Sequence, residues 1–331
     1  MENKKSSSGF VKNVKQYAGP LSILVLLVLI LWVTTKTFMT TSNMVSLLQN
    51  ICVNALLSAG VTCVIIIGCI DLSIGSTVAA CSVIAVVLNT GLGWNVWIAV
   101  LVAILAGGLV GAINGGIRAA TMLPPFIITL ATQQAIRGVA YIFTGGSPIV
   151  STDATFNAIG KTSFLGLPVM FYIMVVSLII VGLILARTRL GRHMYAVGGN
   201  MEAAKHSGIS YAKVSVVAYT IMGLLAGLSG VIMASRLSSG QPTIGGGAGT
   251  DYSTDAIAAA VIGGTAFSGG FGSVFGSFLG ACIIGVLNSG MTHLKVDSYW
   301  QMVAKGILIL LAVYYDSIKG KIKIGKKKAA A

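Results

Sequence analysis

The chain alternates long apolar stretches with short polar connections. Stretches such as 21–33 and 171–186 are continuously apolar, whereas the strands of a membrane barrel alternate polar and apolar residues. A helix needs about 20 mostly apolar residues to cross a bilayer. The pattern therefore predicts ten transmembrane helices, at 20–35, 46–67, 73–90, 95–117, 125–144, 167–186, 214–235, 255–268, 272–290 and 299–316.

Composition places the chain in the membrane class. Of its 331 residues, 55% are hydrophobic and 9% are charged, against roughly 25% charged residues in a soluble domain. We expect an all-α membrane protein with one membrane domain, 20–316, which contains a cytoplasmic loop at 187–213. A basic segment, 1–19, precedes this domain, and a basic tail, 317–331, follows it.

The positions of the basic residues predict an orientation. Ten crossings put both termini on one side, and cytoplasmic loops are rich in Lys and Arg. The terminal side receives 16 of the 22 Lys and Arg residues, the other side receives 4, and 2 lie within spans. The termini and the 187–213 loop are thus expected in the cytoplasm. The net charge of +14 is then a topology signal and a contact for anionic lipid, and not a nucleic-acid surface.

Glycines recur at four-residue spacing within several predicted spans. This spacing places small residues on one helix face, where two helix backbones can approach closely. We expect tight helix packing at three sets of glycines: Gly107, Gly111 and Gly115; Gly223 and Gly227; and Gly272, Gly276 and Gly280. The glycine-rich stretch 263–276 lacks the phosphate-binding patterns, and it is expected to form a tight cytoplasmic turn.

The polar loop 187–213 contains a predicted short helix with its own start and stop signals. Asn200 can cap its N-terminus, Glu202 suits the positive end of the helix dipole, and Gly208 can adopt the left-handed conformation that ends a helix. A helix of two turns cannot bury a core of its own. We therefore expect it to be held by another protein.

Ionisable residues inside a membrane are costly and invite a functional interpretation. Gln133 and Arg137 share one face of the fifth span. That face can line a path for a polar solute, or Arg137 can extend to the outer interface or pair structurally; both interpretations stay open. Lys305 lies near the start of the last span, where extension to the interface is expected.

Two acids are expected to cap helices. Asp71 precedes the third span and Asp255 begins the eighth. A path role for Asp71 is the alternative. No acid is expected near the middle of the membrane. Neither the three histidines nor the five cysteines form a recognisable metal or catalytic pattern, so no catalytic residue and no metal site are expected.

Several stretches, in this order and spacing, are similar to one known family. The chain resembles the permease subunits of bacterial ATP-binding-cassette importers for simple sugars, the group that includes ribose, methyl-galactoside and autoinducer-2 permeases. The stretches are 71–76 (DLSIGS), 114–115 (NG), 125–130 (PFIITL), 145–148 (GGSP), 191–208, 255–259 (DAIAA), 263–270 (GGTAFSGG) and 299–301 (YWQ).

The resemblance implies a permease fold in the bacterial inner membrane that works by alternating access. It implies a coupling helix, marked by Glu-Ala-Ala-x-x-x-Gly, which docks on a separate ATPase subunit. The coupling residues are Arg192, Asn200, Glu202, Ala203, Ala204, Lys205 and Gly208. The chain has no G-x-x-x-x-G-K-[ST] motif, so ATP and Mg²⁺ are expected on the partner and no cofactor on this chain.

The resemblance also implies two further partners and leaves two rivals. A second permease chain completes the path, and an extracytoplasmic binding protein delivers sugar to the loops 145–166 and 236–254. The path residues expected here are Gln133, Arg137 and Asp71. One rival is a permease of the same architecture for branched-chain amino acids or nucleosides. The other is an ion-coupled secondary transporter, which would require inverted repeats and coupling carboxylates.

Overall fold

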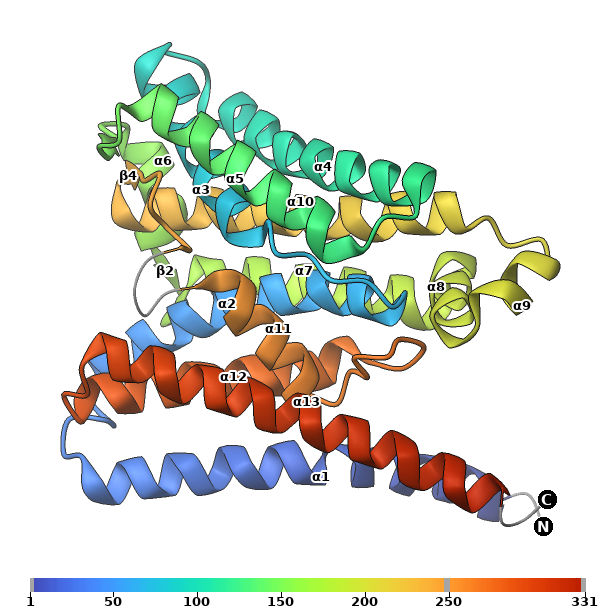
Figure 1. Cartoon of the computed structure of the whole chain (residues 1–331). Coiled ribbons are helices and arrows are strands. Elements are labelled where there is room, and N and C mark those ends of the chain that lie inside the picture. The colour runs from blue at the N-terminus through green and yellow to red at the C-terminus, as the bar shows by residue number, and fades with distance from the viewer. Residues whose placement is uncertain (1–2, 247–250, 329–331) are drawn as a thin grey trace.

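The computed structural model describes residues 3–246 and 251–328, and these form an almost entirely helical bundle (Figure 1). The helices are α1 (Asn3–Thr34), α2 (Thr41–Ile66), α3 (Ile74–Val86) with the π-helical η1 (Val87–Gly91), α4 (Val96–Thr121), α5 (Pro125–Thr144), α6 (Ala154–Lys161), α7 (Val169–Arg187), α8 (Arg189–Gly199), α9 (Met201–His206), α10 (Tyr211–Leu237), α11 (Tyr252–Ile262), α12 (Val274–His293) and α13 (Ser298–Lys328). Two antiparallel pairs of short strands join loops: β1 (Ile149–Val150) with β4 (Ser239–Gly240), and β2 (Ser163–Phe164) with β3 (Leu167–Pro168).

The helices match the predicted spans, with one correction. Within the described residues, eight helices are long and apolar enough to cross a bilayer, and α11 and the first part of α13 are shorter apolar helices. The eighth predicted span, 255–268, is wrong in length, because α11 ends at Ile262 after 11 residues. Such a helix is about 16 Å long, roughly half the thickness of the hydrocarbon core.

Both ends of the described chain lie at the end of the bundle that also carries α8 and α9 (Figure 1). This arrangement is the one expected for an even number of crossings. The predicted basic segments are largely helical, since α1 runs from Asn3 into the first span and α13 continues from the last span to Lys328. Residues 1–2 and 329–331 of these segments, and 247–250 of the predicted outer loop, lie outside the described residues.

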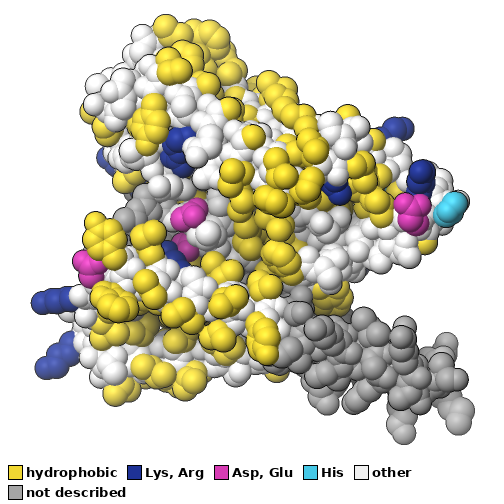
Figure 2. Space-filling model, viewed as in Figure 1, with side chains coloured by type: hydrophobic (Ala, Val, Ile, Leu, Met, Phe, Trp, Pro, Cys, Tyr) yellow, Lys and Arg dark blue, Asp and Glu magenta, His cyan; other side chains and the backbone are white. Residues whose placement is uncertain are grey.

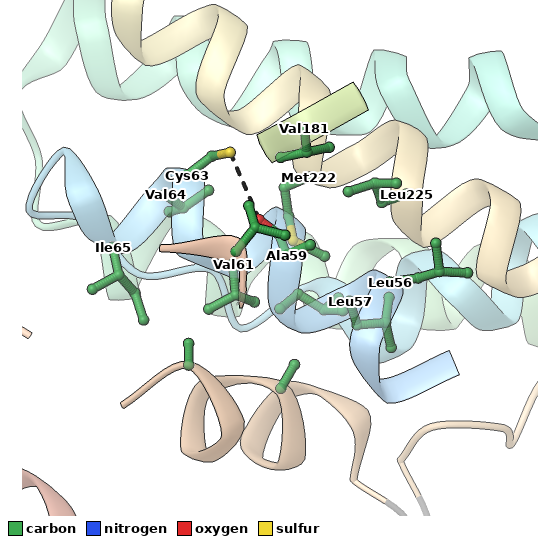
Figure 3. Close-up of a cluster of buried hydrophobic side chains, with 14 of the residues drawn as sticks. Leu56, Leu57, Ala59, Val61, Cys63, Val64, Ile65, Val181, Met222 and Leu225 are labelled. Atoms are coloured by element: carbon green, nitrogen blue, oxygen red, sulfur yellow. Dashed lines mark hydrogen bonds between the residues drawn. The ribbon is translucent and has the colours of Figure 1, made fainter. Parts of the chain in front are cut away.

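The core surrounds α2. Every residue of α2 from Ile51 to Ile66 is buried, and the helix packs against α7, α10, α11 and α12. Figure 3 shows part of this cluster, in which Leu56 and Leu57 lie near Met222 and Leu225 of α10. Most of its side chains are apolar, which suits a position among other helices.

The glycine spacing predicts the closest helix pair correctly. Gly107 of α4 lies against Gly223 and Gly227 of α10, Gly111 lies against Tyr219, and Gly115 lies against Val216. A Cβ atom at any of these five glycines would overlap backbone atoms of the other helix. Gly276 and Gly280 of α12 lie equally close to Gly263 and Ala259 of the α11 segment. The prediction is wrong for Gly272, because this residue precedes α12, which begins at Val274.

The predicted turn between α11 and α12 is confirmed. Gly264, Gly269 and Gly270 have φ angles of 93°, 85° and 74°, which favour glycine because it lacks a Cβ. The amide of Ala266 donates to the carbonyl oxygen of Phe271 at 2.9 Å. This turn, 263–273, lies at the same end of the molecule as α8.

Candidate functional site

The polar loop between α7 and α10 folds into two consecutive helices. Thr188 begins α8 by accepting a hydrogen bond from the amide of Gly191 at 3.2 Å, and Asn200 begins α9 by accepting one from the amide of Ala203 at 2.9 Å. Gly208 has a φ of 78° just after α9 ends. The cap and the left-handed glycine predicted from the sequence are therefore confirmed, whereas α8 was not predicted.

The predicted coupling residues fall into an exposed set and one buried member. Arg192, Asn200, Glu202, Ala203, Lys205 and Gly208 are exposed. Figure 2 shows acidic, basic and histidine side chains gathered at this end of the molecule. Ala204 is only 4% exposed and packs into the chain's own core. Its small side chain lets α9 lie against the bundle, and its contact with a partner stays a prediction.

Helix α8 is closely joined to the central helix and to the 263–273 turn. A Cβ at Gly198 would overlap the carbonyl oxygen of Ile66 and lie 2.6 Å from the amide of Gly270. The Gly270 amide donates to the same Ile66 oxygen at 2.8 Å. Three backbone segments thus meet with no space between them.

Tyr195 adds a side-chain link at this junction. Its hydroxyl donates to the carbonyl oxygen of Gly272 at 2.8 Å. Burial raises the pKa of Tyr195, so the phenol keeps the proton that this bond requires. The connection between α8 and the turn therefore holds across the physiological pH range.

Two short helices begin inside the bundle and meet at their N-termini. The backbone between α2 and α3 is irregular, and the amide of Gly75 donates to Ser253 Oγ of α11 at 3.2 Å. The same hydroxyl donates to the carbonyl oxygen of Leu72 at 2.9 Å. From this point α3 leads to the end that carries α6, and α11 leads to the turn beside α8. Broken helices of this kind are typical of transporters.

Irregular backbone at this depth requires internal hydrogen-bond partners, and Asp71 helps to supply them. Its Oδ1 accepts from the amide and the hydroxyl of Ser73 at 2.8 and 2.6 Å. Ser73 Oγ in turn accepts from Asn114, whose Oδ1 accepts from Thr132 at 2.6 Å. Asp71 therefore ties the irregular segment to α4 and α5. The predicted cap is wrong in position, because Ser73 occupies the N-cap of α3.

Arg137 joins α5 to the loop that precedes α11. Its guanidinium donates to the carbonyl oxygens of Pro242 and Ile244 at 2.6 and 2.8 Å and to Ser76 Oγ at 3.2 Å. Of the two interpretations left open by the sequence, these bonds favour structural pairing. Gln133, one turn earlier on the same face, is half-buried.

Asp255 and Lys305 form a buried ion pair that sequence reasoning missed. Lys305 Nζ lies 3.1 Å from Asp255 Oδ2, and the two residues are 6% and 3% exposed. The expectation that Lys305 extends to the interface is wrong, and so is the capping role of Asp255, since Asp251 caps α11. The expected lack of acids in the membrane interior is also wrong. The partners are 50 residues apart, and hydropathy alone does not pair them.

Within the described residues, no group of three or more His, Cys, Asp or Glu side chains is placed to hold a metal ion. The site thus consists of the exposed surface of α8 and α9, the close junction of α8 with α2, and the helices α3 and α11, which begin inside the bundle.

Comparison with known proteins matches the chain almost end to end. A family model described as the permease component of a branched-chain amino acid transport system matches residues 43–313. The ribose import permease RbsC of Escherichia coli strain K12 is 43% identical over 307 residues, covering 90% of this chain and 93% of that protein. The RbsC of Bacillus subtilis strain 168 is 41% identical, covering 92% and 94%.

A third relative is more distant. The xylose transport system permease XylH of Escherichia coli strain K12 is 31% identical over 366 residues, covering 92% of each protein. No solved structure matches the chain. The match includes both α8–α9 and the broken helices, and the apolar helices make the chain a multi-pass membrane protein. The chain therefore belongs to the permease family of ATP-binding-cassette importers whose motifs its sequence contains.

Proposed function

We propose that this chain is the membrane-spanning subunit of an importer for a simple sugar. The observation that carries the proposal is the 41–43% identity to ribose import permeases along nine-tenths of the chain. The xylose permease extends this likeness to a second pentose. Similarity along the whole chain supports a shared transport role better than any single motif does.

Neither rival has comparable support. The family description names branched-chain amino acids, but the relatives above are named for ribose and xylose. An ion-coupled transporter needs carboxylates that can release their protons. Asp71 accepts two hydrogen bonds from Ser73, and Asp255 is paired with Lys305. Both carboxylates thus have partners within the fold. This supports a transporter whose energy comes from a separate ATPase and not from ion binding to this chain.

In this proposal a separate ATPase binds ATP and Mg²⁺ and contacts α8 and α9. The exposed residues Arg192, Asn200, Glu202, Ala203, Lys205 and Gly208 form the docking surface, with Glu202 and the two basic side chains offering charge pairs. A second permease chain completes the path, and a binding protein delivers sugar at the opposite end. Gln133 lies on the path, and Arg137 and Asp71 hold the broken helices that line it.

Reconstitution tests the proposal directly. The chain is purified with its ATPase, inserted into liposomes and supplied with its binding protein and labelled ribose, xylose or galactose. We expect sugar to accumulate only when ATP is present on the α9 side. Accumulation driven by a proton or sodium gradient without ATP would overturn the proposal, and so would uptake of leucine in place of all three sugars.

The orientation gives a prediction that uses the chain's buried cysteines. Four of the five native cysteines are buried and Cys282 is half-buried, so the parent chain should react weakly with a membrane-impermeant maleimide. Thr152 and Ser207 are exposed at opposite ends. We expect Thr152→Cys to be labelled in intact spheroplasts and Ser207→Cys only after permeabilisation. The reverse pattern would invert the proposed topology.

Reversing the charge at Glu202 on α9 should weaken binding of the ATPase and reduce sugar uptake. Glu202→Arg places a positive charge in the first turn of α9, against the helix dipole, at about 1 kcal/mol. It also leaves any cation that faces Glu202 on the ATPase without its partner, which costs about 2–5 kcal/mol at a buried interface. We expect at least a tenfold loss of uptake and weaker ATPase co-purification, measured on equal amounts of inserted protein.

The control for this variant is Glu202→Gln, which removes the charge and keeps the shape. It should retain more uptake than Glu202→Arg, because no repulsion is introduced. If Glu202→Arg transports sugar and retains the ATPase as the parent does, Glu202 has no coupling role.

A further inference from the structure

A polar cleft opens at the end of the bundle opposite α8 and α9. It has a volume of about 290 Å³ and lies between α2, α11, α12 and α13. It extends from the start of α2 and the end of α12 to Asn54, near the middle of α2. The cleft is therefore an indentation in the membrane domain that reaches about half its depth.

Two polar stripes form the walls. Ser46, Asn50 and Asn54 follow one another at four-residue spacing on α2, and Asn288 and Thr292 do the same on α12. This spacing puts each set on one helix face. Polar side chains in a membrane domain are costly and mark functional positions.

Beyond Asn54 the polar face of α2 continues, but the cleft ends. Ser58 and Thr62 are fully buried, and Thr62 Oγ1 lies 2.5 Å from Ser277 Oγ of α12. Ser58 Oγ donates to Ala55 O at 3.1 Å. These hydroxyl groups satisfy one another and the backbone, so they form a floor, and the cleft is open at one end only.

Two amide oxygens at the inner end of the cleft have unused hydrogen-bonding capacity. Asn54 is 5% exposed, and its Oδ1 has no hydrogen-bond partner among the described residues. The same holds for Asn288 Oδ1. The orientation of the Asn288 amide is fixed, because its Nδ2 donates to Asp255 Oδ2 at 3.3 Å, and Lys305 holds that carboxylate from the other side. A buried acceptor without a partner is unfavourable unless a ligand supplies the donor.

We propose that this cleft is a monosaccharide-binding site, in which Asn54 and Asn288 accept hydrogen bonds from sugar hydroxyl groups. The inference rests on the proposed function and assigns it a site that the sequence did not predict. Carboxamides suit a polyol, because each offers both donors and an acceptor. The volume lies at the lower limit of ligand pockets, about 300 Å³, which fits a single small sugar better than a disaccharide.

The charges around the cleft favour a neutral ligand. Asp255 lines it, but its carboxylate is held by Lys305. Arg236 donates to Asn50 Oδ1 at 2.8 Å, and His293 Nδ1 lies 3.1 Å from Thr37 Oγ1. The lining therefore presents mainly amide and hydroxyl groups, which recognise a sugar better than the paired charges of an amino acid.

The test replaces Asn54 with leucine, which has nearly the same shape and no polar atoms. If Asn54 were a structural residue, Asn54→Leu would lower the thermal midpoint of the purified protein. Because its Oδ1 is unpaired, we expect the midpoint to be unchanged or higher. In the reconstituted importer with labelled ribose, xylose and galactose, we expect uptake to fall at least fivefold while stimulation of ATP hydrolysis by the loaded binding protein is retained.

The matched control is Ser229→Ala. Ser229 Oγ on α10 is also buried without a partner, but Ser229 does not line the cleft. Its loss should leave uptake unchanged. If Asn54→Leu and Ser229→Ala both transport sugar as the parent does, the cleft is not a sugar-binding site, although the proposed function stands. If the parent takes up none of the three sugars, the proposed function itself fails.

Thiol protection gives a second, independent measurement. Ser46 is exposed on the cleft wall, so Ser46→Cys should react with an impermeant maleimide from the outer side. We expect a large excess of the transported sugar, without binding protein or ATP, to slow this reaction and to leave that of Thr152→Cys unchanged. Equal rates with and without sugar at Ser46→Cys would overturn the proposal.

Discussion

Gly111→Leu is expected to prevent the membrane domain from assembling. A side chain at Gly111 would overlap the backbone carbonyl of Tyr219 on α10. A backbone atom cannot move aside as a flexible side chain can, so α4 and α10 must separate. Overpacking a core typically costs about 1–3 kcal/mol, and separation of two helices also removes the close contacts that hold them together in lipid. We therefore expect almost no monodisperse protein in a size-exclusion assay of a fluorescent fusion.

Gly116 provides the control, five residues further along α4. No atom lies within 4 Å of a Cβ built there. Gly116→Leu should insert, elute and transport as the parent does. If both variants elute as the parent does, close backbone contact does not hold α4 against α10. If both fail, the loss comes from a general property of the helix and not from this interface.

The sequence predicts the parts of the fold that depend on local patterns. Apolar stretches indicate the crossing helices, and the four-residue glycine spacing indicates that α4 packs closely, because both signals lie within one helix. Asn200 and Gly208 mark the ends of α9 in the same way. The capping interactions involve residues only a few positions apart, so a single sequence contains the information they require.

The features that the sequence did not reveal depend on distant partners. Lys305 pairs with Asp255, and the irregular backbone near Leu72 is satisfied by Ser253. The sequence divides the second and third spans at this segment, but it does not show that the segment lies inside the bundle. Gly263 and Gly264 follow α11 directly and mark its end in the sequence, but the meeting of its N-terminus with that of α3 had no such signal.

The cleft had a signal in the sequence that hydropathy alone overlooks. Polar residues occupy every fourth position of the central helix, at Ser46, Asn50, Asn54, Ser58 and Thr62. A helix buried among other helices should be apolar on all faces. A continuous polar face on such a helix therefore indicates a partner of its own, which here is the polar face of α12 and the cleft between them.

Gly198→Ala is expected to break the connection between the coupling segment and the central helix while the fold survives. The added methyl group would overlap the carbonyl oxygen of Ile66, which also accepts from Gly270 at 2.8 Å. Because α8 lies at the end of the bundle, it can shift outward at a cost of about 1–3 kcal/mol. The exposed face of α9 is unchanged, so the ATPase should still bind.

The expected result for Gly198→Ala is ATP hydrolysis without sugar accumulation: at least a tenfold loss of uptake with normal ATPase co-purification. Gly199→Ala is the control, since a Cβ at this neighbouring position meets no atom within 4 Å. It carries the same loss of backbone freedom, so only the contact differs between the two variants. If they transport equally, force does not pass from α8 to α2 through this junction. If Gly198→Ala also loses the ATPase, the residue supports docking and not transmission.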